Sequence, residues 1–204
     1  MLEIEMKFRV DDLAAYERLV QKTLGAAFGE PTTESDVFFT NEALGFPNEG
    51  KSLRIRRRGN YLATTFKGAR LDKETKTREE LELTLVDEGQ DVTAETTRRV
   101  DQARDDWIRF YERLGFAQYG RVVKTRRRAE AVFEGRRVEI TLDVIDGLGS
   151  FTELEVMAEK SDFAAAKTDV MVLAASLGLR ETILQSYLSM VCAKDQYLCS
   201  CDAK

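Results

Sequence analysis

The 204-residue sequence contains no histidine. This absence excludes every mechanism within the chain that depends on an imidazole, namely Ser-His-Asp and Cys-His nucleophiles, histidine general bases and histidine-bound zinc. Carboxylates, lysines, arginines, tyrosines and hard metal ions remain available for a reaction. Any catalysis by this chain must therefore be built on these groups.

Cysteine is scarce, and long hydrophobic runs are missing. The 3 cysteines, Cys192, Cys199 and Cys201, lie near the C-terminus, and their odd number favours reduced thiols. No apolar run approaches the ~20 residues that a membrane span needs. Acidic residues begin at Glu3, which argues against a signal peptide. We therefore expect a cytoplasmic protein without a membrane partner.

Excess positive charge is also absent, because the net charge is -5 although 33% of the residues are charged. Proteins that bind nucleic acids in general carry a basic surface that releases counterions from the phosphate backbone, so we expect no nucleic-acid partner. The length suits one domain with a sizeable core. We expect a single domain over residues 1–192 and a C-terminal tail over residues 193–204.

Charged and apolar residues alternate in many short segments. In the first, Glu3, Glu5 and Lys7 occupy one set of alternate positions, and apolar residues occupy the other. Side chains of a strand point to opposite faces in turn, so this pattern predicts a strand with one charged and one apolar face. The pattern recurs at residues 54–56, 65–67, 80–82, 124–126, 139–143 and 153–155. We expect an α+β fold in which antiparallel strands form a closed β-barrel around a charged lumen, with helices packed on the outside.

Helical spacing and turn residues separate these strands. Hairpin turns are expected at Gly59-Asn60, Glu134-Gly135 and Asp146-Gly147. Helices are expected over residues 11–24, with Asp11 as the N-cap, and over residues 91–114, 161–177 and 181–192. A strand is expected over residues 78–86. The polar stretch at residues 68–77 is expected to be a loop. The Gly-rich stretch at residues 45–52 matches the P-loop pattern, but a strand pattern follows it where a P-loop needs a helix, so we reject that interpretation.

The charged faces suggest a site for an anion with a bound metal. Cations suited to phosphate oxygens are Lys7, Arg54, Arg56, Lys67, Arg78, Lys124 and Arg126. Carboxylates that could share a hard cation are Glu3, Glu5, Glu80, Glu82, Asp143, Glu153 and Glu155. A triphosphate with Mg²⁺ or Mn²⁺ satisfies both sets. The alternative is a lumen whose charges are neutralised by internal salt bridges alone. The cost of desolvating buried charges commonly offsets the Coulomb energy that such salt bridges gain.

The segment Glu3-Ile4-Glu5-Met6-Lys7 resembles the E-x-E-x-K signature of the CYTH superfamily, which contains class IV adenylyl cyclases and thiamine triphosphatases and folds as a triphosphate tunnel. Residues 34–39, 50–54, 67–68, 138–143, 146–153 and 186–187 resemble the cyclase branch in particular. The resemblance implies metal ligands at Glu3, Glu5, Asp143, Glu153 and Glu155. It implies phosphate-binding residues at Lys7, Arg54, Arg56, Lys67, Lys124 and Arg126. We expect Lys67, Lys124, Arg126 and Asp143 to act most directly in the reaction.

The resemblance implies a metal-dependent enzyme that converts ATP to cyclic AMP and pyrophosphate. Many hydrolases of the family carry a tyrosine where this sequence has Phe38 and Phe39, which weakens a lysine-tyrosine base for activating water. A phosphohydrolase acting on tripolyphosphate, thiamine triphosphate or nucleoside triphosphates is the alternative, and a non-catalytic polyphosphate or nucleotide binder is a third interpretation. An apolar strip exposed at a barrel edge would favour a homodimer.

Overall fold

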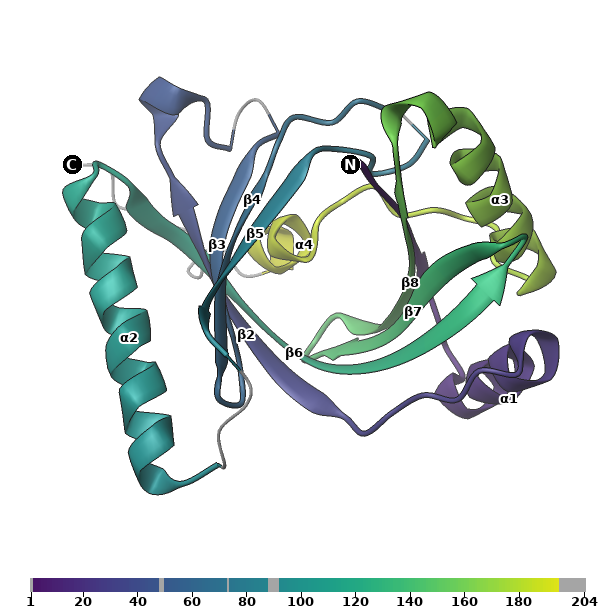
Figure 1. The fold of residues 1–204 in the computed structure, drawn as a ribbon, viewed down its shortest axis with the longest axis horizontal. Coiled ribbons are helices and arrows are strands. Elements are labelled where there is room, and N and C mark those ends of the chain that lie inside the picture. The colour runs from purple at the N-terminus through teal and green to yellow at the C-terminus, as the bar shows by residue number, and fades with distance from the viewer. Residues whose placement is uncertain (1, 48–49, 73, 88–91, 195–204) are drawn as a thin grey trace. The chain divides into compact units, whose positions relative to one another are not determined.

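The computed structural model describes residues 2–47, 50–72, 74–87 and 92–194 (Figure 1). In these ranges the chain forms eight strands and four α-helices. The strands are β1 (Leu2–Arg9), β2 (Thr32–Thr40), β3 (Ser52–Arg58), β4 (Tyr61–Lys67), β5 (Glu80–Val86), β6 (Ala117–Phe133), β7 (Arg136–Ile145) and β8 (Gly149–Ala158). The helices are α1 (Leu13–Leu24), α2 (Ala94–Arg113), α3 (Phe163–Ser176) and α4 (Tyr187–Lys194).

The strands are hydrogen-bonded in the order β1-β8-β7-β6-β2-β3-β4-β5. The strand pairs whose registers are defined are all antiparallel. The expected α+β class with an antiparallel sheet is therefore confirmed. Closure of this sheet into a barrel around a charged lumen stays a prediction.

The chain divides into two compact units. The first unit comprises Met1–Pro31, Arg70–Glu79 and Lys124–Gln185, and the second comprises Thr32–Ala69, Glu80–Val123 and Ser186–Lys204. Strand β6 continues from the second unit into the first at Val123–Lys124. Each unit has its own hydrophobic cluster.

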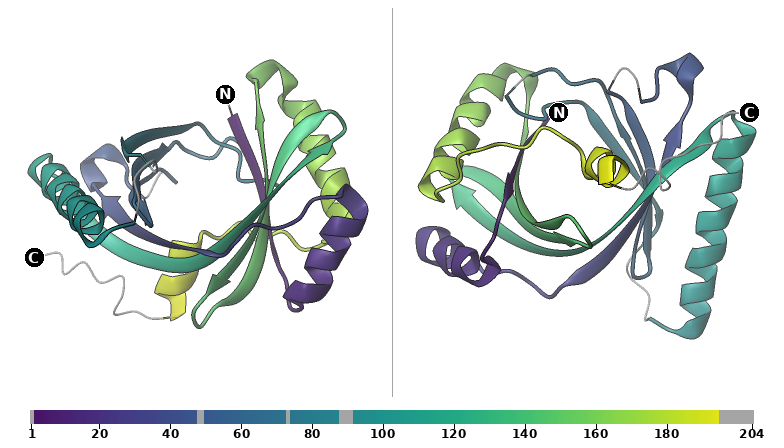
Figure 2. Two further views of the ribbon diagram at one scale, coloured as in Figure 1. Left: turned by 60° about the horizontal axis from the view of Figure 1, so that its bottom comes forward. Right: turned by 180° about the vertical axis from the view of Figure 1, so that it is seen from behind.

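In the first unit, the apolar faces of β1, β7 and β8 pack against α1 and α3 (Figures 1 and 2). Ile4, Ile140 and Leu154 are fully buried in this cluster, together with Val20 of α1 and Leu173 of α3. Burying these apolar faces leaves the opposite strand faces for charged residues, as the alternation requires. The unit thereby presents the charged residues of neighbouring strands on one side of its sheet.

In the second unit, α2 packs on β3, β4 and β5. Ile55 and Leu62 of the strands are buried with Val100 of α2. The helix begins after Thr93, whose side chain accepts a hydrogen bond from the backbone of Thr96 in a capping box. Here too the apolar strand faces are covered by a helix.

The turns and most element boundaries agree with the sequence. Gly59, Glu134, Gly135 and Gly147 have positive φ angles, as the three expected hairpin turns require. Helix α1 ends at Gly25, which has a φ of 68°. The expected loop at residues 68–77 contains no named strand or helix among its described positions.

Several expected boundaries were wrong. The cap of α1 is Asp12 rather than Asp11, because its side chain accepts from the backbone of Ala15. Helix α4 begins at Tyr187, so the helix expected from residue 181 is six residues too early. Strand β5 begins at Glu80, whereas Arg78 forms an isolated bridge with Glu3.

Two further expectations concern helix α2 and the cysteines. Helix α2 begins at Ala94, and residue 91, where it was expected to begin, lies outside the described residues. Cys192 is disulfide-bonded, so the expectation of reduced thiols is wrong for this residue. Cys199 and Cys201 belong to the stretch of the chain that is not described.

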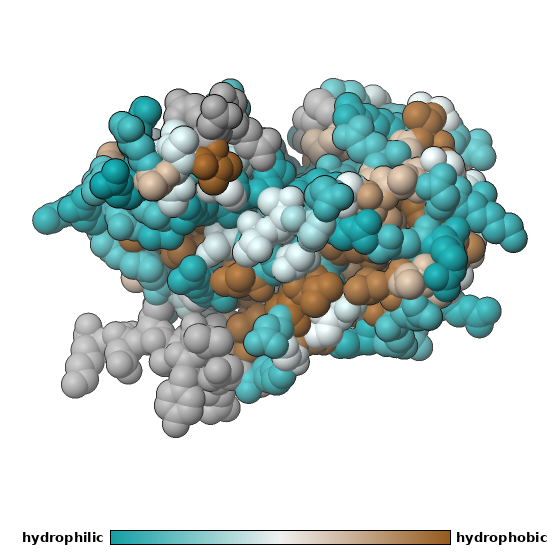
Figure 3. Space-filling view, turned by 90° about the horizontal axis from the view of Figure 1, so that it is seen from below, coloured by the Kyte–Doolittle hydropathy of each residue, from teal (hydrophilic) through white to brown (hydrophobic). Residues whose placement is uncertain are grey.

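The face drawn in Figure 3 is mostly hydrophilic, and hydrophobic residues gather near its middle. Exposed hydrophobic residues include Phe110 in α2 and Leu114 just after it. Within the described ranges, no helix has both the length and the apolar character needed to cross a bilayer. The homodimer stays a prediction.

Candidate functional site

The candidate site in the first unit begins with the charged face of β1. Glu3, Glu5 and Lys7 are all buried, with exposed fractions of 6%, 5% and 1%. Strand β8 runs antiparallel beside β1 and places Glu155 directly opposite Glu5, and Glu153 directly opposite Lys7. Residues that face each other in register lie on the same side of a sheet, so these side chains share one face.

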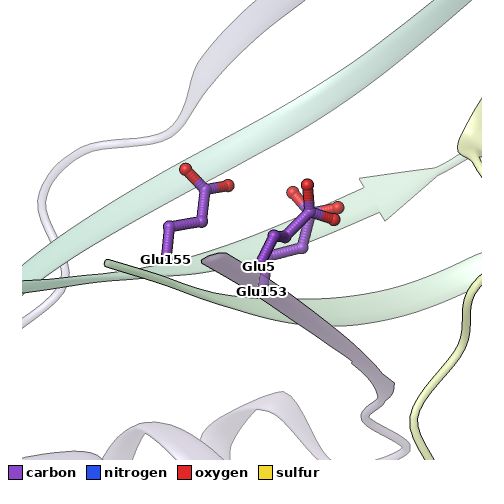
Figure 4. Close-up of side chains that lie close together, drawn as sticks. All are labelled: Glu5, Glu153 and Glu155. Carbon is purple, nitrogen blue, oxygen red and sulfur yellow. The ribbon is translucent and has the colours of Figure 1, made fainter. Parts of the chain in front are cut away.

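Three carboxylates of this face meet. Oxygens of Glu5, Glu153 and Glu155 lie within 4.8 Å of one another. Figure 4 shows the carboxyl groups of Glu5 and Glu153 close together, with that of Glu155 beside them and on the same side of the strands. Among the described residues, Glu3 and Asp143, which were also expected to bind metal, lie outside this three-carboxylate cluster.

Glu155 has a like-charged residue opposite it on both sides. It faces Glu5 on β1 and Glu139 on β7. Burial raises the pKa of Glu155 well above its ordinary value, and the nearby charges of Glu3 and Glu153 raise it further, although Arg126 opposes them. A carboxyl group in such surroundings is stabilised as an anion only when more positive charge is added.

Glu153, two residues away on the same strand, has the opposite environment. Its carboxylate lies 3.2 Å from Nζ of Lys7 and forms an ion pair with Arg126. Burial alone would raise the pKa of Glu153, but Lys7 and Arg126, followed by Lys124 and Lys76, lower it well below its ordinary value. The cluster thus joins one carboxyl group whose pKa is lowered by cations to one whose pKa is raised by burial and like charges.

The three-carboxylate cluster suits a hard divalent cation. Magnesium and manganese prefer carboxylate oxygens, and Mg²⁺ is commonly held by one or two carboxylates together with substrate phosphates. Added positive charge would also relieve the like-charge pairing of Glu5 with Glu155. The donor set and its electrostatics therefore fit the metal that the sequence predicted.

Asp143 organises the expected phosphate-binding residues of β6. It is fully buried and accepts two hydrogen bonds from Arg126, at 2.6 Å to Oδ1 and 2.5 Å to Oδ2. Nζ of Lys124 lies 3.3 Å from Oδ2 of the same carboxylate. A bidentate arginine is fixed in orientation as well as charge, so Asp143 positions both cations. A direct role of Asp143 in metal binding stays a prediction.

Lys7 is the most deeply buried cation of the first unit. Burial lowers its pKa to about 7, and neighbouring Lys76 also lowers it, while Glu153 and Glu5 oppose the shift. Its Nζ donates to the backbone carbonyl of Gln185 at 3.2 Å. The Lys7 ammonium is therefore a poorly solvated donor that an added anion would stabilise.

The second unit contains the other expected cations. Arg56 donates to Asp36 from Nε and Nη2, both at 2.8 Å, and its Nη1 lies 3.2 Å from Glu34. Arg54 contacts Asp36 at 3.5 Å. Nζ of Lys67 lies 2.6 Å from Glu80. These cations are therefore grouped with carboxylates of their own unit.

Sequence reasoning missed three charged residues beside these groups. Lys76 lies in the expected loop, yet it is buried and pairs with Glu5 at 2.5 Å. Glu34 and Asp36 are the buried partners of Arg56. Lys76 and Arg78 are two residues apart, and so are Glu34 and Asp36. This alternation of charged residues could have identified Lys76, Glu34 and Asp36 from the sequence.

The P-loop interpretation is excluded by the local structure. Ser52, at the end of the pattern, begins strand β3 instead of a helix. Lys51 donates to the carbonyl of Leu44 at 3.2 Å. Among the described residues of this stretch, a strand follows the pattern where a P-loop needs a helix N-terminus, so the rejection of a P-loop is confirmed.

The geometry can be compared with known proteins. The model of the CYTH domain family matches residues 1–186. The chain is 29% identical over 155 residues to a protein of Methanocaldococcus jannaschii named "Putative adenylate cyclase MJ0240", covering 76% of this chain and 77% of that protein.

Solved structures show the same fold. The PH1819 protein from Pyrococcus horikoshii OT3 has a TM-score of 0.74 and 28% sequence identity, covering 94% of this chain and 99% of that chain. The Hippeastrum protein HpAC1, named a "putative adenylyl cyclase" with a dominant triphosphatase activity, has a TM-score of 0.59 and 18% identity, covering 95% of each chain. At that identity the second likeness concerns the fold alone.

Proposed function

The chain belongs to the CYTH domain family, and from this premise we propose that it is a Mg²⁺- or Mn²⁺-dependent enzyme that converts ATP to cyclic AMP and pyrophosphate. The observation that carries the proposal is the three-carboxylate cluster Glu5, Glu153 and Glu155, in which Glu155 faces like charges on both neighbouring strands. A protein gains little stability from such an arrangement, so a bound cation is its best explanation.

The residues of the first unit have separable roles in this proposal. Glu5, Glu153 and Glu155 would hold the metal, which would supply positive charge to polarise a phosphate group. Lys7, Lys124 and Arg126 bind phosphate oxygens and neutralise the negative charge of the triphosphate. Asp143 keeps Lys124 and Arg126 in place, as its hydrogen bonds indicate.

Cyclisation needs mainly positioning. The 3′-hydroxyl oxygen of ATP forms a bond to the α-phosphorus and its proton passes to solvent, while the bond from that phosphorus to the bridging oxygen breaks and pyrophosphate leaves with the electron pair. Because the nucleophile belongs to the substrate, proximity supplies much of what a strong base would otherwise provide.

We extend the phosphate-binding role to Arg54, Arg56 and Lys67 of the second unit and to Arg78, on the basis of the family resemblance.

A triphosphatase is the second candidate function. It is favoured by HpAC1, whose name joins an adenylyl cyclase to a dominant triphosphatase activity. In that reaction, a water oxygen forms a bond to the γ-phosphorus and a proton passes to solvent, while the bond from that phosphorus to the β–γ bridging oxygen breaks, so that orthophosphate and the corresponding diphosphate are released. Phe38 and Phe39 carry no hydroxyl that could help a lysine to activate water, and this favours the cyclase.

One assay separates these functions. The purified protein is offered ATP, tripolyphosphate and thiamine triphosphate with Mg²⁺ or Mn²⁺, and cyclic AMP, pyrophosphate and orthophosphate are measured separately. We expect cyclic AMP and pyrophosphate from ATP, and no turnover in excess chelator. Faster release of orthophosphate from tripolyphosphate would assign a hydrolase. If the protein binds a triphosphate without converting it, the third interpretation, a non-catalytic polyphosphate or nucleotide binder, would be the correct one.

A further inference from the structure

Lys76 reaches the three-carboxylate cluster from residues 70–79, a segment that lies outside the named strands. This segment is hydrogen-bonded along β1, because the amide of Lys76 donates to the carbonyl of Glu5 at 3.0 Å, and Glu3 and Arg78 exchange two backbone hydrogen bonds. The backbone of Lys76 is therefore fixed beside the residue whose side chain it contacts. This local register gives the lysine a defined position next to Glu5.

A second set of contacts anchors the same segment. Asp72 accepts hydrogen bonds from the backbone amides of Glu74 and Thr75, at 2.9 and 2.7 Å. Lys167 of α3 lies 2.8 Å from Asp72 and 2.5 Å from Glu74. Although burial opposes the change, hydrogen bonds from Lys167 and Thr75 lower the pKa of Asp72. Asp72 is therefore an ionised anchor for the segment that carries Lys76.

The Lys76 ammonium contacts two of the three carboxylates. Its Nζ lies 2.5 Å from Oε1 of Glu5 and 3.9 Å from Oε1 of Glu153, and the residue is only 2% exposed. A divalent metal coordinated by these oxygens would meet the positive charge of Lys76 at close range. In a poorly solvated site, two such cations repel each other strongly. The lysine and the metal therefore compete for the same carboxylate.

We propose that Lys76 is the counter-ion of Glu5 and Glu153 in the metal-free protein, and that it exchanges this role for a phosphate oxygen when a metal and a triphosphate bind together. When the metal binds Glu5, Lys76 loses its carboxylate partner. The triphosphate then supplies a new negatively charged partner for Lys76. Metal binding and triphosphate binding are then coupled, each raising the affinity for the other. The first half of the proposal concerns the metal alone, whereas the second half rests on the proposed function.

The first experiment measures Mn²⁺ affinity by calorimetry without any triphosphate. Lys76→Met should bind Mn²⁺ roughly tenfold more tightly than the wild type, the scale of one neighbouring charge. Lys76→Arg, which keeps the charge, and Lys22→Met, which removes a charge from an exposed position of α1, should bind like the wild type. Unchanged or weaker binding by a folded Lys76→Met protein overturns the proposal. Thermal melting checks folding, and Lys76→Gln replaces Lys76→Met if that variant does not fold.

The second experiment repeats the titration with imidotriphosphate, which resists hydrolysis, after correction for Mn²⁺ bound by the free analogue. The analogue should raise the Mn²⁺ affinity of the wild type by about tenfold more than that of Lys76→Met. An equal increase in both proteins contradicts the exchange of Lys76 to phosphate. No increase in either protein contradicts the exchange and the proposed triphosphate function together, while the result of the first experiment still stands for the metal alone.

Discussion

The two units use charged strand faces in different ways. In the second unit, opposite charges face each other across neighbouring strands, as Asp36 faces Arg56 and Lys67 faces Glu80. In the first unit, Glu155 has the carboxylates Glu5 and Glu139 opposite it. Complementary pairs need no further ion, whereas like-charged pairs are destabilising. This like-charged pairing in the first unit is the feature on which the proposed metal site rests.

The buried cations follow the same division. Arg56 already has two carboxylate partners, so removing it would leave both carboxylates without their main source of positive charge. Removing the charge of Glu155 would relieve repulsion in the cluster instead. Similar substitutions in the two units should therefore change stability in opposite directions.

The largest expected effect is a loss of stability in the second unit. Arg56→Ala should lower the free energy of unfolding by about 3–5 kcal/mol, because it removes the cationic partner of a buried ion pair with Asp36 and Glu34. Denaturant unfolding measures the change. Arg109→Ala is the matched control, since the ion pair of Arg109 with Asp106 is exposed and should contribute at most about 1 kcal/mol. Equal losses in both variants would contradict the prediction.

Next in size is a loss of activity in the first unit. Glu155→Gln should reduce metal-dependent turnover of the triphosphate by about 10²-fold or more, because an amide is a poorer metal ligand than a carboxylate. Glu139→Gln is the control on the neighbouring strand, since Glu139 lies outside the three-carboxylate cluster. Steady-state assays with Mg²⁺ and Mn²⁺ measure both variants. Comparable turnover of Glu155→Gln and the wild type would remove Glu155 from the metal site.

A smaller effect, of opposite sign, concerns stability. In excess chelator, Glu155→Gln should be more stable than the wild type. Because the pKa of Glu155 is raised in the folded protein, its protonated form contributes stability that is complete below the unfolded pKa and is lost as pH rises through the folded pKa. Glutamine does not titrate, so the advantage of the variant should grow as pH rises from about 4.5 through the folded pKa. Melting temperatures at several pH values measure this trend, and a constant difference would argue against it.

The smallest effect is expected at Lys51. Lys51→Ala should change turnover by less than about twofold, because no phosphate-binding helix follows this lysine. Lys124→Ala should reduce turnover severely, since Lys124 is buried next to Asp143. Parallel assays of the two variants make the comparison. The reverse order would restore the P-loop interpretation.

The position of a residue on a strand face was predictable from the sequence. The two-residue period placed Glu5 and Lys7 on one face because it depends only on the geometry of the strand itself. The hairpin turns were predictable for a related reason, since positive φ angles favour glycine locally. The start of α4 and the cap of α1 were harder to predict from the sequence, because neighbouring positions carry similar capping and boundary signals.

The sequence by itself determined the charged and apolar faces, the order of most helices and strands, and the carboxylates and cations available for a site. Only the tertiary structure decided that Glu155 faces Glu5 while Glu153 faces Lys7, because register depends on pairing between strands that are far apart in the chain. It also decided that Lys76, from a segment without a named strand, is buried against Glu5. Periodicity is a local property of the chain, whereas the neighbours of a buried charge are set by contacts that no local pattern encodes.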